Sequence, residues 1–253
     1  AIGPSIGLSL VSLVGYSMTF AINACIMLIA AFMAFQIKIN FKRTKKLKIS
    51  LHNSIAKEAL LPAALLFFLT MEFCVINSFL IVFAIEQGVS SNIGLYYTVC
   101  AATMLFTRPV VGKLTDRFGF VKVLIPALFC NVIAFFIISS SHMLLTFLIA
   151  AIFSAFGFGA CQPAIQTLSM KAVTNERRGA ASSTNFIGMD LSSIIGPIIA
   201  GSIAQAFGYV TMWRVMVIPF CIAISLVFFF RNRIICIEEN FISNQCQEAS
   251  LEA

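Results

Sequence analysis

Charged residues are scarce in this sequence, and their scarcity excludes an ordinary water-soluble globular protein. Only 11% of the 253 residues are Asp, Glu, Lys or Arg, whereas 60% are hydrophobic. A soluble domain is typically about half apolar and about one quarter charged. Because water solvates this much apolar surface poorly and a lipid bilayer solvates it well, we expect a membrane protein.

The residues and motifs that most enzyme, metal and nucleotide sites need are also missing. The two histidines, His52 and His142, fall on opposite sides of the predicted membrane and so do not form one catalytic centre. None of the eight cysteines forms a C-x-x-C pair, which argues against a disulfide framework or a zinc site. A nucleotide-binding loop of the G-x-x-x-x-G-K-(S/T) type does not occur. We therefore expect no enzyme, no cofactor, no metal and no self-contained ATP-driven pump.

What the sequence does contain is a series of long apolar runs. A membrane-spanning helix needs about 20 mostly apolar residues. The runs do not alternate as barrel strands do, so they predict helices. The first run is too short to span alone and starts at Ala1 rather than Met, so we expect a chain truncated upstream. The eight predicted segments cover residues 1–14, 16–37, 59–84, 91–111, 121–139, 143–168, 183–206 and 211–231.

Basic residues gather in every second connection between these segments. Of the 17 Lys and Arg, only Arg214 falls on the opposite side. Lys and Arg collect in cytoplasmic loops of membrane proteins. The net charge of +7 therefore indicates topology in a cell membrane, with no nucleic-acid partner. The segments predicted to be cytoplasmic are residues 38–58, 112–120, 169–182 and the C-terminus.

An internal repeat relates the first segment to the seventh. Ile2-Gly3-Pro4 matches Ile195-Gly196-Pro197, and Gly15-Tyr16 matches Gly208-Tyr209, with an offset of 193 throughout. Duplicated bundles are typical of secondary transporters. The repeat predicts that residues 1–37 end one six-helix bundle, 38–58 form a basic linker and 59–231 form a second, complete bundle. The Glu-containing residues 232–253 are expected to be a disordered tail.

The connection at residues 112–122 reads G-K-L-T-D-R-F-G-F-V-K. It resembles the G-x-L-x-D-R-x-G-(R/K)-(R/K) signature of the major facilitator superfamily, which lies between the second and third helices of each half. Phe120 and Val121 replace the usual basic pair. The resemblance implies a latch that holds one conformation, with Asp116 accepting hydrogen bonds at a helix N-terminus; the alternative is a plain cytoplasmic turn. The latch residues would be Gly112, Asp116, Arg117, Gly119 and Lys122.

Two further stretches carry the resemblance. Gly3, Pro4 and Gly7 resemble the G-P-x-x-G motif of antiporters in this superfamily, although small residues here also serve helix packing alone. Glu176 and Arg177 begin a stretch similar to the family's E-R-x-x-A-x-(S/G) entry into a helix. Together these motifs imply a drug/proton antiporter.

Two carboxyl groups lie inside predicted membrane segments. Glu72 falls near the middle of 59–84, and Asp190 lies about two turns into 183–206. Apolar surroundings favour the neutral form of a carboxyl group, and buried acids in membranes are commonly functional. We therefore predict that Glu72 and Asp190 are proton-coupling candidates, with a structural hydrogen-bonding role as the alternative.

Other polar residues and helix-loosening residues also mark the spans. In the family, the first and fourth helices of each half line the cavity, here 59–84 and 143–168. The cavity candidates are Asn77, Gln162, Gln166 and Asn185, and the gate candidates are Gly157, Gly159 and Pro163. Interhelical hydrogen bonds and close packing are the alternatives for these residues.

These patterns predict an all-α membrane protein with the major facilitator fold, comprising a second six-helix bundle and the last two helices of the first. The predicted function is proton-coupled export of a small molecule by alternating access. A uniporter or importer of the same fold, or a non-transporting membrane fragment, is the alternative. The expected partners are a small-molecule substrate, protons and the lipid bilayer, and the complete protein is expected to be monomeric.

Overall fold

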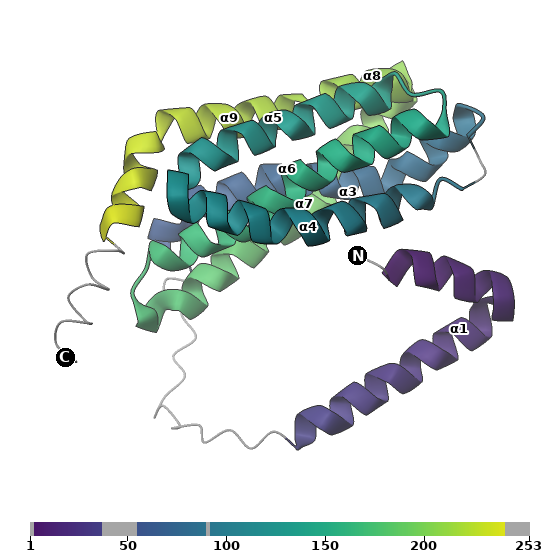
Figure 1. Ribbon diagram of the computed structural model, residues 1–253, viewed down its shortest axis with the longest axis horizontal. Coiled ribbons are helices and arrows are strands. Elements are labelled where there is room, and N and C mark those ends of the chain that lie inside the picture. Colours follow the sequence, from purple (N-terminus) through teal and green to yellow (C-terminus); the bar gives the residue numbers. More distant parts are fainter. Residues whose placement is uncertain (1–2, 37–54, 90–91, 241–253) are drawn as a thin grey trace. The chain divides into compact units, whose positions relative to one another are not determined.

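The computed structural model describes residues 3–36, 55–89 and 92–240, and every regular element in these ranges is helical (Figure 1). The all-α prediction is therefore confirmed for the described chain. The chain divides into two compact units, residues 1–49 and 50–253. Most of the predicted linker, residues 38–54, and the end of the tail, residues 241–253, lie outside the described residues.

The described residues of the first unit form one helix, α1 (Gly3–Phe35), which breaks at Gly15. This break separates the two segments that the sequence predicts here. The second unit holds a bundle with helical structure at each of the six predicted segments, although the helix at 91–111 continues to Phe118 and the helix at 183–206 begins at Arg178. It contains η1 (Lys57–Ala59), α3 (Leu60–Glu86), α4 (Leu95–Phe118), α5 (Phe120–Ser139), α6 (Leu144–Lys171), η2 (Asn175–Arg177), α7 (Arg178–Phe207), α8 (Tyr209–Val215) and α9 (Ile218–Phe229).

Six stretches of the described residues are long and apolar enough to cross a membrane. α4 is not among them, although the sequence predicts a span at 91–111. Its charged residues, including Arg108 and Lys113, lower its hydropathy. The six stretches are Leu13–Phe35, Lys57–Glu86, Phe120–Ser139, Leu144–Lys171, Asn175–Phe207 and Tyr209–Phe229.

Three glycines with the same unusual backbone conformation join helices directly. Gly15, Gly119 and Gly208 have φ of 76°, 85° and 81° with ψ of 170°, 158° and 164°. This region of backbone space is open essentially to glycine only. Gly15 and Gly208 are equivalent positions of the sequence repeat, so the repeat extends to the backbone turn.

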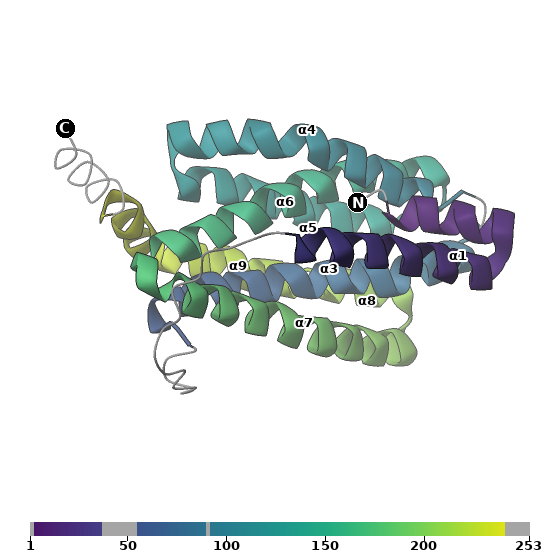
Figure 2. The same ribbon diagram turned by 90° about the horizontal axis from the view of Figure 1, so that it is seen from below.

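Within the second unit, α3 and α6 lie in the middle, and α4 and α7 lie at opposite edges (Figure 2). Glycines bring α7 close to α3. A Cβ on Gly188 would lie 2.8 Å from the carbonyl oxygen of Ala63, and one on Gly196 would lie 2.9 Å from that of Met71. Small residues at such contacts let helices pack tightly in membranes.

An aromatic cluster holds α8 and α9 against α3 and α5. The fully buried Trp213 ring lies 6.0 Å from Phe83 and 5.3 Å from Phe135 between centroids, and Phe135 lies 5.3 Å from Phe220. Aromatic pairs at these separations stabilise a fold beyond their area of burial. The cluster fixes the broken helix α8–α9 despite its interruption at residues 216–217.

Residues 231–240 are helical, which corrects the predicted disordered tail over that range. Ile234 is fully buried in the core of the second unit. The Glu238 carboxylate accepts hydrogen bonds from the Phe120 backbone N–H, at 3.2 Å to each oxygen. These contacts join residues far apart in sequence, so the polar composition of the tail did not reveal them.

Candidate functional site

The latch motif occupies the end of α4, the Gly119 turn and the start of α5. Gly119, with φ of 85°, joins the end of α4 directly to the start of α5. Gly112 lies within α4, and a Cβ added there would have no atom within 4 Å, so this glycine serves no close packing in the described chain. Lys122 is exposed on α5.

The two charged residues at the centre of the motif lie elsewhere than expected. Asp116 lies in the last turn of α4, at a helix C-terminus, whereas we expected it at an N-terminus. The N-terminus of α5 is capped instead by Glu238, because its first N–H groups have no partner within the helix. The Arg117 guanidinium lies 5.4 Å from the centre of the Phe118 ring. Sequence reasoning missed Glu238 because the tail carries no motif that marks it.

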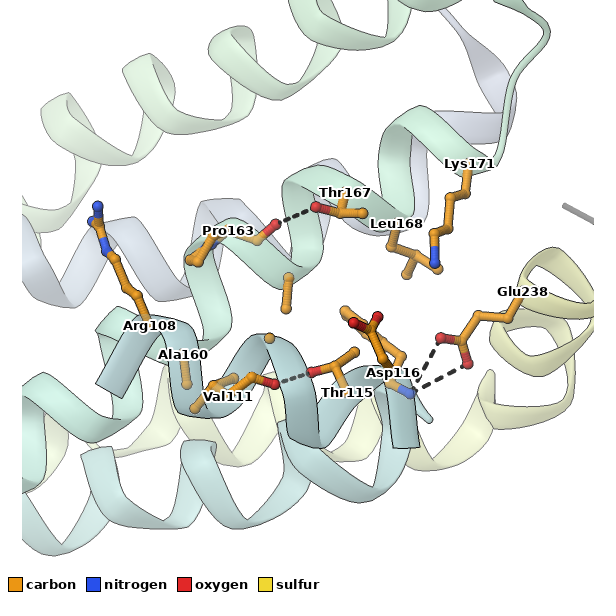
Figure 3. A pocket seen from close by; sticks show the side chains of 13 residues that line it. Arg108, Val111, Thr115, Asp116, Ala160, Pro163, Thr167, Leu168, Lys171 and Glu238 are labelled. Carbon is orange, nitrogen blue, oxygen red and sulfur yellow. Dashed lines mark hydrogen bonds between the residues drawn. The ribbon is translucent and has the colours of Figure 1, made fainter. Parts of the chain in front are cut away.

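A charged cleft of about 190 Å³ lies between α4, α6 and residues 231–240. Figure 3 shows Asp116, Lys171 and Glu238 toward one end of this cleft and Arg108 toward the other. Pro163 and Thr167 form part of its α6 wall. The charged cleft therefore brings the latch residues Gly112 and Asp116 together with two cations and a second acid.

An uncharged cleft of about 340 Å³ lies on an adjacent face of α6, against α7. Its lining combines amide, hydroxyl and apolar side chains with no charged group. The lining residues are Pro163, Gln166, Thr167, Met170, Ser182, Asn185, Phe186 and Met189. The structure thus brings together three predicted site residues, namely Gln166, Asn185 and Pro163.

Polar groups in the uncharged cleft have hydrogen-bonding capacity to spare. Asn185 is 3% exposed, and neither its amide nitrogen nor its amide oxygen has a partner among the described residues. The Gln166 amide nitrogen lies 3.9 Å from the Met189 sulfur, which is a long hydrogen bond to a weak acceptor. A buried amide without partners is costly. Because both amide atoms of Asn185 are buried, a molecule in the cleft would reach them only after the side chain turns toward it.

The other two cavity candidates lie apart from this cleft. Asn77 is exposed on α3, and its amide donates to the carbonyl of Phe73 in its own helix, at 2.9 Å. Gln162 is half-buried on α6, one turn before Gln166, and does not line the cleft.

The gate candidates on α6 are positions of close packing. A Cβ on Gly157 would overlap the Asn131 amide of α5, and one on Gly159 would lie 3.0 Å from the Met104 Cγ of α4. Pro163 lines both clefts, and the Thr167 hydroxyl donates to its carbonyl at 2.9 Å. A gating role for these three residues stays a prediction.

The two intramembrane carboxyl groups have opposite environments. Glu72 on α3 is 1% exposed, and neither carboxyl oxygen has a hydrogen-bond partner among the described residues. It lines a cavity of about 10 Å³ with Asn131 and Ser154. Asp190 is exposed on the surface of the second unit.

The end of the basic linker is attached to the start of α7. The Arg177 guanidinium pairs with the Glu58 carboxylate at 2.6 Å, and the Ala56 N–H donates to the Thr184 hydroxyl at 3.0 Å. Both charged side chains are nearly half exposed, at 42% and 46%, so the pair contributes little stability and chiefly orients the linker. Arg177 was singled out by its motif, whereas its partner Glu58 was not.

Comparison with known proteins identifies the family to which the chain belongs. A model described as Major Facilitator Superfamily matches residues 1–119 and 60–234. "Multidrug resistance protein MdtG" of Enterobacter lignolyticus is 33% identical over 121 residues, which cover 46% of this chain and 28% of that protein. The protein of the same name from Salmonella arizonae is 30% identical over 141 residues, covering 54% and 32% respectively. The chain thus aligns with about a third of the length of these curated relatives, and it is a multi-pass membrane protein that belongs to the Major Facilitator Superfamily.

Proposed function

We propose that this protein is a secondary transporter that exports small, largely apolar molecules in exchange for protons. The observation that carries the proposal is the uncharged cleft, where the unpaired Asn185 amide lies among apolar side chains. Ligand sites are typically apolar with a few well-placed polar groups. Met170 and Met189 add flexible, polarisable surface that adapts to different molecules. The relatives are named multidrug resistance proteins, which supports a small-molecule cargo.

Proton exchange is assigned to the intramembrane carboxyl groups. An unpaired charge near mid-bilayer costs several kcal/mol by most measures. Glu72, which has no partner among the described residues, is therefore held as the neutral acid until water reaches it. Asp190, which is exposed, is the second candidate.

The orientation follows from the basic residues. Two groups of basic residues would lie in the cytoplasm. They are Lys113, Arg117 and Lys122 around the Gly119 turn, and Lys171 and Arg178 around η2. The charged cleft beside them would then close and open at the cytoplasmic end during alternating access.

The test uses inverted membrane vesicles that contain the complete chain. We expect a lipophilic cationic dye to accumulate inside them when the vesicle interior is acidic, and accumulation to collapse with the gradient. Glu72→Gln keeps the side-chain shape but cannot titrate, so uphill accumulation should be lost while dye binding partly survives. Glu86→Gln, which makes the same substitution at an exposed position of α3, is the matched control.

Each other outcome identifies a different function. Dye movement that follows only the concentration gradient of the dye and does not depend on the pH gradient would indicate a uniporter. Dye movement out of the vesicles would indicate import. If Glu72→Gln responds to the gradient like the wild-type protein, Glu72 is structural and the proton uses another group.

A further inference from the structure

We propose that Glu72, Asn131 and Ser154 form a proton site with one bound water inside the second bundle, and that the stacked rings of Phe73 and Phe158 gate it. This inference rests on the proposed function only where it says that transport uses the proton. The cavity and its lining residues support the site itself.

Three helices contribute one polar side chain each to this site. Glu72 comes from α3, Asn131 from α5 and Ser154 from α6, and they are 1%, 3% and 5% exposed. Both Glu72 oxygens and the Asn131 amide nitrogen have no hydrogen-bond partner among the described residues. Buried polar groups are almost always hydrogen-bonded, so these atoms require a partner that fits between them.

The size of the cavity selects that partner. Its volume is about 10 Å³, and one water needs roughly 10–15 Å³ together with two to four polar partners. A cargo molecule does not fit. A metal cation would need about six oxygen ligands, and three polar side chains do not supply them. The remaining ligand of suitable size and chemistry is a water that accepts from the neutral Glu72 acid or the Asn131 amide and donates to the free oxygen of Glu72.

Gly157 explains how Asn131 reaches the cavity. Any Cβ at position 157 would overlap the Asn131 amide. A glycine on α6 therefore leaves the space in which the α5 amide lies beside Glu72. The gate candidate Gly157 thus acquires a specific structural role next to the proton site.

A stacked pair of rings separates this cavity from the exposed face of α3. The centroids of Phe73 and Phe158 are 4.4 Å apart and their planes differ by 12°. Both rings line the cavity. Phe73 is also 38% exposed, on the face of α3 that carries Asn77, whereas Phe158 is 8% exposed. Displacing the rings would open the shortest route from that face to Glu72.

No charged side chain besides Glu72 lines this cavity among the described residues. The titratable side chains that interact with Glu72 are the Cys221 thiol of α9 and the Cys161 thiol of α6. No Lys, Arg or His of the described residues lines the cavity. Asn131 on α5 is uncharged, and Asp190 on α7 is exposed. Ionisation of Glu72 therefore needs water to enter, which ties proton release to the opening of the Phe73–Phe158 pair.

The test measures access to Glu72 directly. An apolar carbodiimide adds to a protonated carboxyl group to give a stable N-acylurea, which peptide mass spectrometry locates. In the complete chain reconstituted in lipid, Glu72 of the wild-type protein should react slowly. Phe158→Ala should increase the rate severalfold, and Phe73→Ala should do the same. Phe156→Ala is the matched control, because Phe156 lies on the same helix and lines a different cleft.

Two results would overturn the proposal. One is equal labelling of Glu72 in the wild-type protein and in both ring variants. The other is equal acceleration by Phe156→Ala, which would indicate general loosening of α6. Asn131→Leu supplies a second test by infrared spectroscopy. The carboxyl carbonyl band of Glu72, identified because it disappears in Glu72→Gln, should shift when Asn131 is replaced. An unchanged band would show that Glu72 and Asn131 do not share a water.

The failure of this inference is distinguishable from that of the proposed function. If export proves independent of the pH gradient while ring removal still exposes Glu72, the site stands and the coupling proposal fails. If export is proton-driven while ring removal changes nothing, the coupling stands and the gate fails.

Discussion

Two adjacent faces of α6 line clefts of contrasting chemistry. Toward α4, the charged cleft carries Arg108, Asp116, Lys171 and Glu238, whereas the uncharged cleft toward α7 has no charged residue. Pro163 and Thr167 belong to both clefts. Opposite charges in a partly exposed cleft are well suited to forming and breaking contacts as a conformation changes. A buried unpaired amide is better suited to holding a cargo. We infer that α6 separates a conformational element from a recognition element.

The comparison also extends to packing, because the helices on the two sides approach their neighbours differently. Gly188 on α7 lies against the backbone of Ala63, whereas Gly112 on α4 has open space beside it. Backbone cannot move aside as a flexible side chain can. The contact between α7 and α3 is therefore tightly packed, whereas Gly112 leaves room beside α4 in the charged cleft.

The largest expected effect comes from a substitution in the contact between α7 and α3. Gly188→Ala places a methyl group 2.8 Å from the Ala63 carbonyl oxygen and should destabilise the fold by about 1–3 kcal/mol. Gly112→Ala is the matched control and should be neutral or stabilising by up to about 1 kcal/mol, because alanine is the better helix former. Thermal unfolding of both variants in detergent measures the difference. Equal stability of the two would show that α7 is free to move away from α3.

A smaller effect should separate recognition from conformational change. Asn185→Ala removes the unpaired amide of the uncharged cleft and should weaken dye binding by roughly fivefold to tenfold, the equivalent of about 1 kcal/mol. Asp116→Asn removes a charge from the charged cleft without changing volume, so it should slow transport and leave dye binding and membrane insertion intact. Equilibrium dye binding and transport rates, measured on both variants, test this division. Weaker dye binding in Asp116→Asn would show that both clefts take part in binding the dye.

The helices and their junctions were predictable because their signals are local. Apolar runs set the positions of α3, α5, α6 and α7, and the gaps between runs 1–14 and 16–37 and between runs 183–206 and 211–231 contain the breaks at Gly15 and Gly208. Each signal depends on neighbouring residues, so the amino-acid order alone contains it.

Contacts between distant parts of the chain were not predictable. Glu238 of the charged cleft contacts Phe120 across 118 positions, and outside the cleft Arg177 contacts Glu58 across 119. The two motifs identified Asp116 and Arg177 but not the residues that lie opposite them. The polar residues of the uncharged cleft were predictable one by one, whereas their assembly, with Gln166 and Asn185 in one cleft, depends on the packing of α6 against α7. The contact of Gly157 with Asn131 likewise depends on how α5 lies against α6.

The smallest expected effect concerns the cap that residues 231–240 place on α5. The Glu238 carboxylate accepts from the Phe120 N–H at the helix N-terminus, where the helix dipole favours negative charge. Glu238→Gln keeps an acceptor oxygen but removes the charge, so it should cost about 0.3–1 kcal/mol of stability at low ionic strength, and less in high salt. Glu239→Gln is the matched control, because the neighbouring side chain is exposed. Hydrogen exchange at the Phe120 amide measures the cap locally and should quicken in Glu238→Gln only. Unchanged exchange in that variant would mean that the cap contributes nothing, and the charged cleft would then consist of α4 and α6 alone.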